Sequence, residues 1–178
     1  MRIKEPLVKR AQLGDRDAFA ALLEQNYDRI YRFAYRWCGH AQDAEEITQE
    51  VCIKLGRVMG SFRGESAFSS WLYRITLNVA KDYMRRSRHT RERTDHEEVL
   101  EYQPDQRAGP ERALISRLIL LCIEQLPEGI RETVLLVHAE GLNHRQAGET
   151  LACAEGTISW RLSEARKALT ICLDKGAS

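Results

Sequence analysis

The stretch GLNHRQAGETLACAEGTISWRLSEARK, residues 141–167, decides how this sequence is interpreted. Asn143 is a favourable N-cap for a short helix that ends near Leu151. A tight turn over residues 152–154 separates this helix from a last one, expected over 155–173. This is the layout of a helix-turn-helix, whose second helix enters the major groove of DNA. A plain helical hairpin in a bundle has the same spacing and remains an alternative.

Small and hydroxyl residues at the start of the last helix favour the DNA interpretation. Gly156 followed by Thr157 lets a helix terminus approach a phosphate closely. The apolar residues of the two helices are expected to form the core of the hairpin instead; they are Ala147, Leu151, Ile158, Leu162 and Ala165.

Upstream of this stretch the pattern stays helical. Pro110 suits a first helical turn, and an apolar run follows it over 114–122. Leu126-Pro127-Glu128 restarts a helix that continues to Gly141. Residues 91–110 lose this periodicity and carry prolines and acidic groups, which indicates a linker.

The first half of the chain carries three apolar stripes at helical spacing, each followed by glycine or a basic run. The first runs from Asp17 to Trp37, and the second from Asp43 to Met59. In the second, Asp43 and Glu46 have the spacing of a capping box. The third begins at Phe68, after a loop over 60–66. A short helix at about 6–13 is expected to pack against all three.

These patterns predict an all-α protein with two small helical domains. Residues 1–94 form an N-terminal helical bundle, 95–112 an acidic linker, and 113–178 a C-terminal helix-turn-helix bundle. Net charge differs between these parts. The first holds 18 Lys and Arg against 12 Asp and Glu, the linker 2 against 6, and the last 7 against 8. The first module is therefore expected to bind a polyanion.

The third stripe is flanked by a basic one. Arg74, Asn78, Lys81 and Arg85 recur on one side of the predicted helix, and Arg88, Arg91 and Arg93 extend the positive run. Such a face suits phosphate contacts, with Asn78 able to reach a base edge. A merely solvated helix face is the alternative.

Two shorter segments offer further contacts. The loop 62–66 contains an aromatic residue, an arginine and backbone amides that suit an extruded base, although it is also a simple connection. The acidic turn 43–46, with Gln49 and Glu50 one turn on, has the wrong sign for DNA and is expected to face a protein. Helix capping accounts for part of that turn.

Other function classes find little support. No run of eighteen apolar residues and no signal peptide is present, which predicts a cytoplasmic protein without membrane insertion. The five cysteines are odd in number and far apart, and are interpreted as reduced core thiols. Cys38 and His40 are near neighbours that leave a shared metal as an alternative. Neither a cofactor nor a catalytic nucleophile is predicted, so the chain is not expected to be an enzyme.

Taken in order, these segments resemble the extracytoplasmic-function (ECF) group of the sigma-70 family, the promoter-recognition subunits of bacterial RNA polymerase. The resemblance spans nearly the whole chain. Its most specific pieces are residues 43–51, 68–75 with Asn78, Leu126-Pro127, 140–142 and 156–158.

The resemblance implies a sigma factor that binds core RNA polymerase and promoter DNA. It assigns Asp43, Glu46, Gln49 and Glu50 to the clamp helices of the polymerase. It assigns Phe62, Arg63, Ser66, Arg74, Asn78, Lys81, Arg85 and Arg86 to melting and holding the −10 element. It assigns Arg145, Thr157, Ser159, Trp160, Arg161 and Arg166 to the −35 element. It also implies control by an anti-sigma protein.

The sequence departs from the family where Ala152 replaces a usual glycine, and where Ser159 and Glu164 replace usual basic residues. The last module is also slightly acidic. These departures motivate a second hypothesis, a sigma-like decoy that binds an anti-sigma protein but not DNA. The turn over 152–158 is similar to that of the branch serving the general stress response of alphaproteobacteria.

Overall fold

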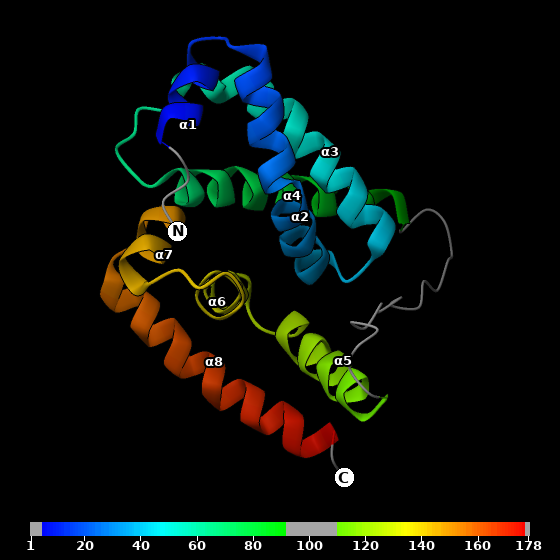
Figure 1. Cartoon of the computed structure of the whole chain (residues 1–178). Coiled ribbons are helices and arrows are strands. Elements are labelled where there is room, and N and C mark those ends of the chain that lie inside the picture. The colour runs from blue at the N-terminus through cyan, green and yellow to red at the C-terminus, as the bar shows by residue number, and fades with distance from the viewer. Residues whose placement is uncertain (1–4, 92–109, 177–178) are drawn as a thin grey trace. The chain divides into compact units, whose positions relative to one another are not determined.

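The computed structural model describes residues 5–91 and 110–176 of the 178-residue chain. Over those residues every element is helical and no strand forms, which confirms the predicted fold class. The helices belong to two compact units, α1 to α4 in the first and α5 to α8 in the second (Figure 1). The acidic linker falls mostly on residues 92–109, outside the described residues, so the domain boundaries at 94 and 112 stay predictions.

The first unit is a bundle of one short helix and three long ones, with a 3₁₀ turn between the last two. Its elements are α1 (Glu5–Gln12), α2 (Arg16–Cys38), α3 (Ala41–Val58), η1 (Met59–Ser61) and α4 (Phe68–Arg91). Gly39 ends α2 with a φ of +73°, a conformation that glycine adopts without the steric cost of a side chain. The predicted stop is therefore confirmed.

The start of α3 differs from the prediction. The helix begins at Ala41, so Asp43 lies inside its first turn and the predicted capping box of Asp43 and Glu46 is wrong. Asp43 is only 4% exposed and accepts a hydrogen bond from α4. A tertiary contact has replaced the local one that the spacing suggested.

The second unit places the helix-turn-helix after two connected helical segments. Its elements are α5 (Pro110–Glu124), α6 (Glu128–Val134), the π-helical turn η2 (Leu135–Ala139), α7 (His144–Leu151) and α8 (Glu155–Gly176). Asn143 caps α7 as predicted: its side chain accepts from the Gln146 amide at 2.8 Å, and the Gln146 side chain accepts from the Asn143 amide at 3.1 Å. This reciprocal pair is a complete capping box.

The turn between α7 and α8 is tight. Ala152 has a φ of +51°, in the left-handed region where the family usually has glycine. The Cys153 amide donates to the Gly148 carbonyl at 3.0 Å, which closes the turn. Gly148 is required there, because a Cβ built on it would lie 2.7 Å from the Cys153 oxygen.

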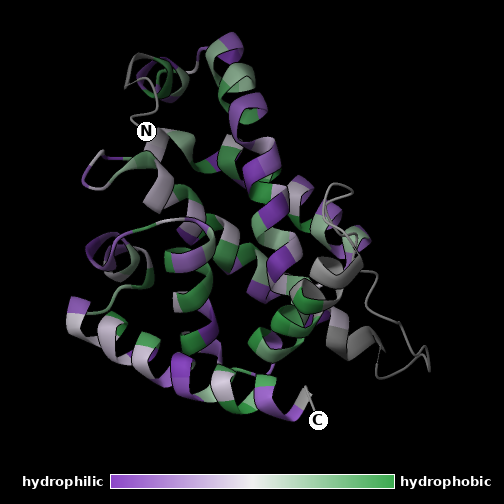
Figure 2. Cartoon of the chain, turned by 60° about the horizontal axis from the view of Figure 1, so that its bottom comes forward, coloured by the Kyte–Doolittle hydropathy of each residue, from purple (hydrophilic) through white to green (hydrophobic). Residues whose placement is uncertain are grey.

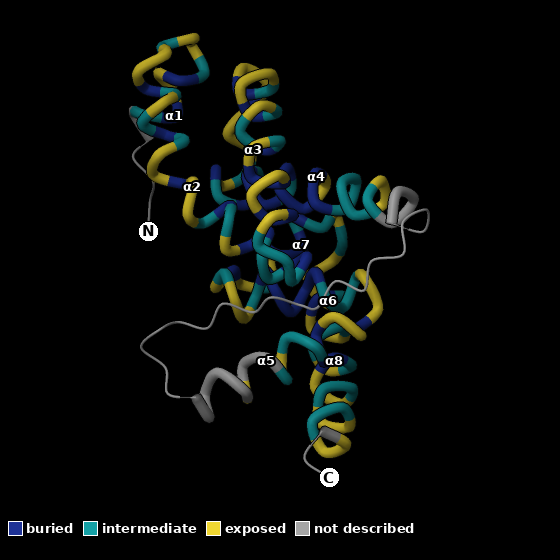
Figure 3. Tube along the Cα trace, turned by 90° about the vertical axis from the view of Figure 1, so that its right-hand side faces the viewer, coloured by how far each residue is buried: buried dark blue, intermediate teal, exposed yellow. Residues whose placement is uncertain are grey.

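Each unit has its own apolar core. In the first, Phe33 and Tyr73 are at most 2% exposed and their ring centroids lie 5.4 Å apart. The middle of α4 is accordingly dark blue in Figure 3. In the second, Ile158 and Ala147 are fully buried, as the hairpin prediction required. Hydrophilic and hydrophobic residues alternate along the helices in Figure 2, as amphipathic packing demands.

The cysteine prediction is wrong in part. Cys122 of α5 and Cys172 of α8 form a disulfide across 50 residues of sequence, whereas Cys38, Cys52 and Cys153 form no disulfide among the described residues. Sequence spacing could not reveal this pair, because the two helices meet only through the fold of the unit. No helix within residues 5–91 or 110–176 is long and apolar enough to cross a membrane.

Candidate nucleic-acid and protein interfaces

Acidic residues of α3 are held by a tyrosine of α4. The Tyr83 hydroxyl lies 2.9 Å from Oδ1 of Asp43 and 2.9 Å from Oε2 of Glu46. Burial and the hydrogen bonds to these two carboxylates raise the pKa of Tyr83 far above its usual range. Tyr83 therefore stays protonated and fixes the position of the acidic turn.

The same two helices are joined by an ion pair. Nη2 of Arg86 lies 2.6 Å from Oε1 and 2.8 Å from Oε2 of Glu50, and this hydrogen bonding raises the pKa of Arg86. The two side chains are 59% and 42% exposed. A residue predicted to bind DNA is thus paired with one predicted to bind the polymerase. Gln49 is exposed on α3.

The remaining polar residues of α4 lie on a different side. At 100° per residue, Arg74, Asn78, Lys81 and Arg85 share one face, whereas Arg86 is turned about 100° away toward α3. Asn78 and Arg85 are exposed, and Arg74 and Lys81 are half-buried. These four residues therefore share one face of α4, and Arg86 lies outside it.

The loop before α4 presents polar groups but not its aromatic ring. Phe62 is 9% exposed, and its ring packs 5.7 Å from Phe68 and 5.0 Å from Trp71. The Arg63 side chain is 82% exposed and lies 3.9 Å from Glu65. Ser66 is half-exposed. Because the Phe62 ring is packed in this conformation, stacking of a base on it requires the loop to rearrange, and the half-buried Trp71 is the more accessible ring.

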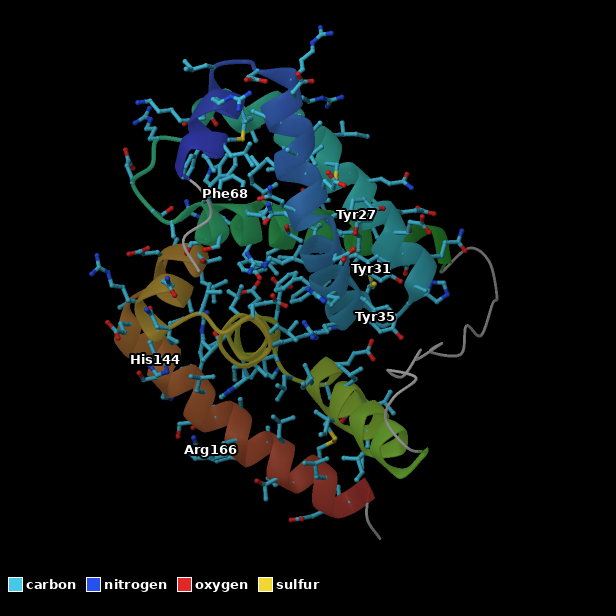
Figure 4. The ribbon with its side chains drawn as sticks, in the orientation of Figure 1. Tyr27, Tyr31, Tyr35, Phe68, His144 and Arg166 are labelled. Atoms are coloured by element: carbon cyan, nitrogen blue, oxygen red, sulfur yellow. A yellow bond between two sulfur atoms is a disulfide. The ribbon has the colours of Figure 1, made fainter. Side chains whose placement is uncertain are left out.

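The helix-turn-helix joins its two helices through polar side chains. Nδ1 of His144, at the start of α7, is hydrogen-bonded to Oγ of Ser159 on α8 at 3.0 Å (Figure 4 labels His144). Trp160 beside it is 59% exposed, and Arg166 two turns on is exposed. Thr157 is half-buried at the helix start. These residues form a mostly neutral surface with one large aromatic side chain.

Two of the predicted −35 residues are engaged elsewhere. Arg161 is half-buried against α6, where a Cβ built on Gly129 would come within 3.0 Å of the guanidinium carbon. Arg145 forms an ion pair with Glu149 at 3.1 Å, with its side chain 80% exposed. Arg161 is therefore placed for packing, whereas Arg145 remains at the surface.

Sequence reasoning missed two residues that organise these surfaces. Neither Tyr83 nor His144 is among the site residues predicted from the sequence. Their positions offered a signal: Tyr83 lies three residues before Arg86, and His144 directly follows the N-cap Asn143. Across residues 5–91 and 110–176, no group of three or more His, Cys, Asp or Glu side chains is placed to hold a metal ion.

Family models match both units. A model described as Sigma-70 region 2 matches residues 22–90, and one described as Sigma-70, region 4 matches residues 116–169. The chain is 35% identical to the RNA polymerase sigma-H factor of Pseudomonas aeruginosa over 175 residues, which cover 93% of this chain and 91% of that protein. It is 31% identical to the ECF RNA polymerase sigma-E factor of Escherichia coli K12 over 174 residues, covering 92% and 90%.

Solved structures are similar as well. The sigma factor RpoE of Bartonella quintana, in complex with the anti-sigma factor NepR, has a TM-score of 0.73 and 25% identity; the match covers 88% of this chain and 96% of that one. CnrH, in complex with the cytosolic domain of CnrY, has a TM-score of 0.72 and 21% identity, covering 95% and 96%. The second likeness shows the fold alone.

Proposed function

The chain belongs to the ECF group of the sigma-70 family and is a sigma factor, and on that premise we propose which surfaces of it serve the polymerase and the promoter. The family implies RNA polymerase and DNA as partners, and it is not enzymatic. We propose that this chain acts in the cytoplasm, where both partners lie.

One observation carries the assignment of surfaces. The region 2 match covers most of α2, all of α3 and almost all of α4. The region 4 match runs from residue 116, within α5, to residue 169, within α8. Region 2 of the family thus matches the first compact unit, and region 4 matches the second. Both polar surfaces described above lie inside these matches.

The docking surface for the polymerase is the outer face of α3. Glu46 and Gln49 are exposed there, and Glu50 is accessible beside its arginine partner. Asp43 is 4% exposed, so it acts by holding Tyr83 and the acidic turn rather than by touching the polymerase. Cationic groups on the clamp helices are the complementary partner.

The −10 surface consists of the polar face of α4 and the loop before it. Arg85 and Asn78 are the most accessible members of the face, and Arg63 and Ser66 add polar groups from the loop. Phosphates contact the cations and carry no sequence information, whereas Asn78 is able to read a base edge. In the free chain the Phe62 ring packs on Phe68 and Trp71.

The −35 surface is the first half of α8 with the start of α7. Ser159, Trp160 and Arg166 are exposed on α8, with Arg145 on α7 and Thr157 half-buried at the helix start. Arg161 is left out, because it packs on α6. With few unpaired cations, this surface is expected to depend on base contacts and shape more than on phosphate charge.

Control by an anti-sigma protein completes the proposal. The Bartonella sigma factor with a similar fold and 25% identity was solved in such a complex. An anti-sigma protein would cover the same exposed helix faces that the polymerase needs.

The test is run-off transcription with purified core enzyme on promoters selected from genomic DNA. The wild-type chain is expected to yield a core-dependent transcript, and Gln49→Ala to lower it through weaker core binding. Gln25→Ala is the matched control, since Gln25 is an exposed glutamine of α2 that lies outside the proposed surfaces. Anti-sigma binding without any affinity for core polymerase would instead support the decoy hypothesis, and the absence of any core-dependent transcript would sink the proposal.

A further inference from the structure

A covalent bond closes the second unit. Sγ of Cys122 near the end of α5 is bonded to Sγ of Cys172 in the last turns of α8, with 5.8 Å between the two Cα atoms. The yellow bond between these helices is visible in Figure 4. The stretch between the two cysteines, whose sequence separation is 50, contains α6, η2, α7 and most of α8. The whole helix-turn-helix therefore lies inside the closed loop.

The setting of this bond is unusual for the function proposed above. A protein that serves RNA polymerase works where thiol systems keep most cysteines reduced, and disulfides found there are mostly transient and redox-sensing. A helical unit of this kind also has a buried core of its own, so the bond is not required to build one. Resting on the proposed function, this combination indicates regulation rather than a permanent structural link.

We propose that Cys122–Cys172 is a reversible redox-modification site, opened by a thioredoxin-class dithiol and closed by a peroxide. Its role is to set how firmly α5 and the end of α8 hold the helix-turn-helix.

The burial of the two sulfurs sets the order of the steps. Cys172 is partly exposed, whereas Cys122 is 2% exposed. A thiolate of the dithiol therefore attacks Sγ of Cys172, and Cys122 leaves as a thiolate that takes up a proton. The second thiol of the reductant then attacks the reductant's first sulfur in the mixed disulfide. This step releases Cys172 and converts the reductant to a disulfide.

Closure uses the same accessible sulfur. The Cys172 thiolate attacks hydrogen peroxide, which breaks the O–O bond and gives a sulfenic acid and one water after protonation. The Cys122 thiolate then displaces hydroxide, which leaves as the second water. Two thiols and one peroxide thus become one disulfide and two waters.

The remaining described cysteines are poorer candidates. Burial raises the pKa of the Cys52 thiol, which lowers its thiolate fraction, and Cys38 is buried. Cys153 lies in the α7–α8 turn and has no disulfide partner among the described residues. The Cys122–Cys172 pair is therefore the site where reduction or oxidation by two electrons can change the stability of the second unit.

The mechanical effect follows from loop closure. A bond across 50 residues removes conformational freedom mainly from the unfolded chain, and typical measured effects correspond to a roughly 30- to 1,000-fold change in the folding equilibrium. Reduction also frees α5, whose Ile115 and Ile119 are already exposed. The reduced unit is thus expected to present Ser159 and Trp160 less firmly.

The experiment uses the full chain equilibrated in glutathione buffers from fully reduced to strongly oxidised, followed by alkylation and counting of free thiols. Two thiols are expected to disappear together as the buffer becomes oxidising, with one peptide pair, Cys122–Cys172, in the mass spectrum. Cys52→Ala is the matched control and should keep the transition. Cys172→Ser should abolish it.

The second readout is functional. Oxidised protein is expected to melt at a higher temperature and to give several-fold more run-off transcript from a −35-dependent promoter than reduced protein, with no such difference in Cys172→Ser. If that variant folds poorly, Cys172→Ala serves as the second chain without the bond. Failure of the pair to form in any buffer, resistance to every dithiol concentration, or identical melting of both forms would overturn the proposal. Thiol counts and melting need no polymerase, so these outcomes are distinct from failure of the proposed function.

Discussion

The two units handle their charges differently. In the first, the pair between Arg86 and Glu50 joins α4 to α3. In the second, Arg145 pairs with Glu149 within α7, and Lys167 pairs with Glu164 within α8. The first unit thus has an ion pair between two helices, besides local pairs such as Arg85–Asp82 within α4, whereas these two pairs of the second unit each lie within one helix.

This difference suggests how each unit meets DNA. In the first unit the basic face lies on α4, and the residues proposed to dock on the polymerase lie on α3, to which α4 is joined. The proposed contacts with polymerase and promoter therefore lie close together. The second unit joins α7 to α8 through a neutral hydrogen bond, a close backbone approach at Gly148 and, further along α8, a disulfide to α5. Its geometry is therefore set by packing, and its affinity for DNA is expected to change less with salt.

The largest effect is expected where the second unit is packed most closely. Gly148→Ala puts a Cβ 2.7 Å from the Cys153 carbonyl oxygen, so the turn has to shift. We expect the free energy of unfolding of this unit to fall by about 2–3 kcal/mol. Denaturant-dependent hydrogen exchange of the α7 and α8 amides measures this loss.

Gly156→Ala is the matched control for that substitution. A Cβ on Gly156 would meet nothing within 4 Å, and alanine favours helix over glycine by up to about 1 kcal/mol. Stability is therefore expected to rise or stay constant. Equal behaviour of the two variants would show that packing does not set the geometry of this unit.

The next effect tests the polar link in the first unit. Tyr83→Phe removes the hydroxyl that donates to Asp43 and Glu46 and leaves a buried carboxylate with one donor fewer. We expect a loss of about 1–2 kcal/mol in the free energy of unfolding, measured by urea titration. Tyr27→Phe, on the more exposed end of the tyrosine row of α2 in Figure 4, should change little.

The same variant has a pH signature. Because the folded pKa of Tyr83 is raised, its contribution is fully present below the unfolded pKa of about 10 and is lost as pH rises through the folded value. Stability of the wild type should therefore decline above about pH 10 more steeply than that of Tyr83→Phe. Parallel curves for the two proteins would contradict the assignment of the shift to Tyr83.

Local patterns predicted the fold well, and side-chain directions poorly. The stop at Gly39 and the cap at Asn143 follow from backbone chemistry within a few residues, which sequence reveals directly. The face of Arg74, Asn78, Lys81 and Arg85 follows from helical periodicity alone. These features needed no knowledge of which helix packs on which.

The differences from the prediction involve packing between helices and loops. Asp43 resembled a cap but binds Tyr83 40 residues away. The Phe62 ring packs on Trp71, and its contact with a base stays a prediction. Arg161 faces Gly129 of another helix, and Cys122 meets Cys172 across 50 residues. A residue type and a short spacing cannot distinguish a surface group from one that a neighbouring helix covers.

The smallest effect probes the contrast in charge directly. Glu50→Gln removes the anion that Arg86 faces, and a partly exposed pair of this kind contributes about 0.2–1 kcal/mol. A double-mutant cycle of Glu50→Gln and Arg86→Gln, followed by urea unfolding, should give a coupling in that range. The coupling should shrink at high salt, because the pair is accessible to ions.

The variant also separates the two roles proposed for these residues. Removing the Glu50 charge leaves the positive charge of Arg86 less neutralised, so Glu50→Gln should raise the affinity of the polymerase-free chain for a single-stranded −10 oligonucleotide by roughly 2- to 5-fold, as measured by fluorescence anisotropy. Glu149→Gln, which frees Arg145 from an intrahelical pair in the second unit, is the control and should leave this affinity unchanged. Equal gains from both variants would mean that any added positive charge suffices. A gain confined to Glu50→Gln would instead show that the junction of α3 and α4 restrains DNA binding until the polymerase engages Glu50.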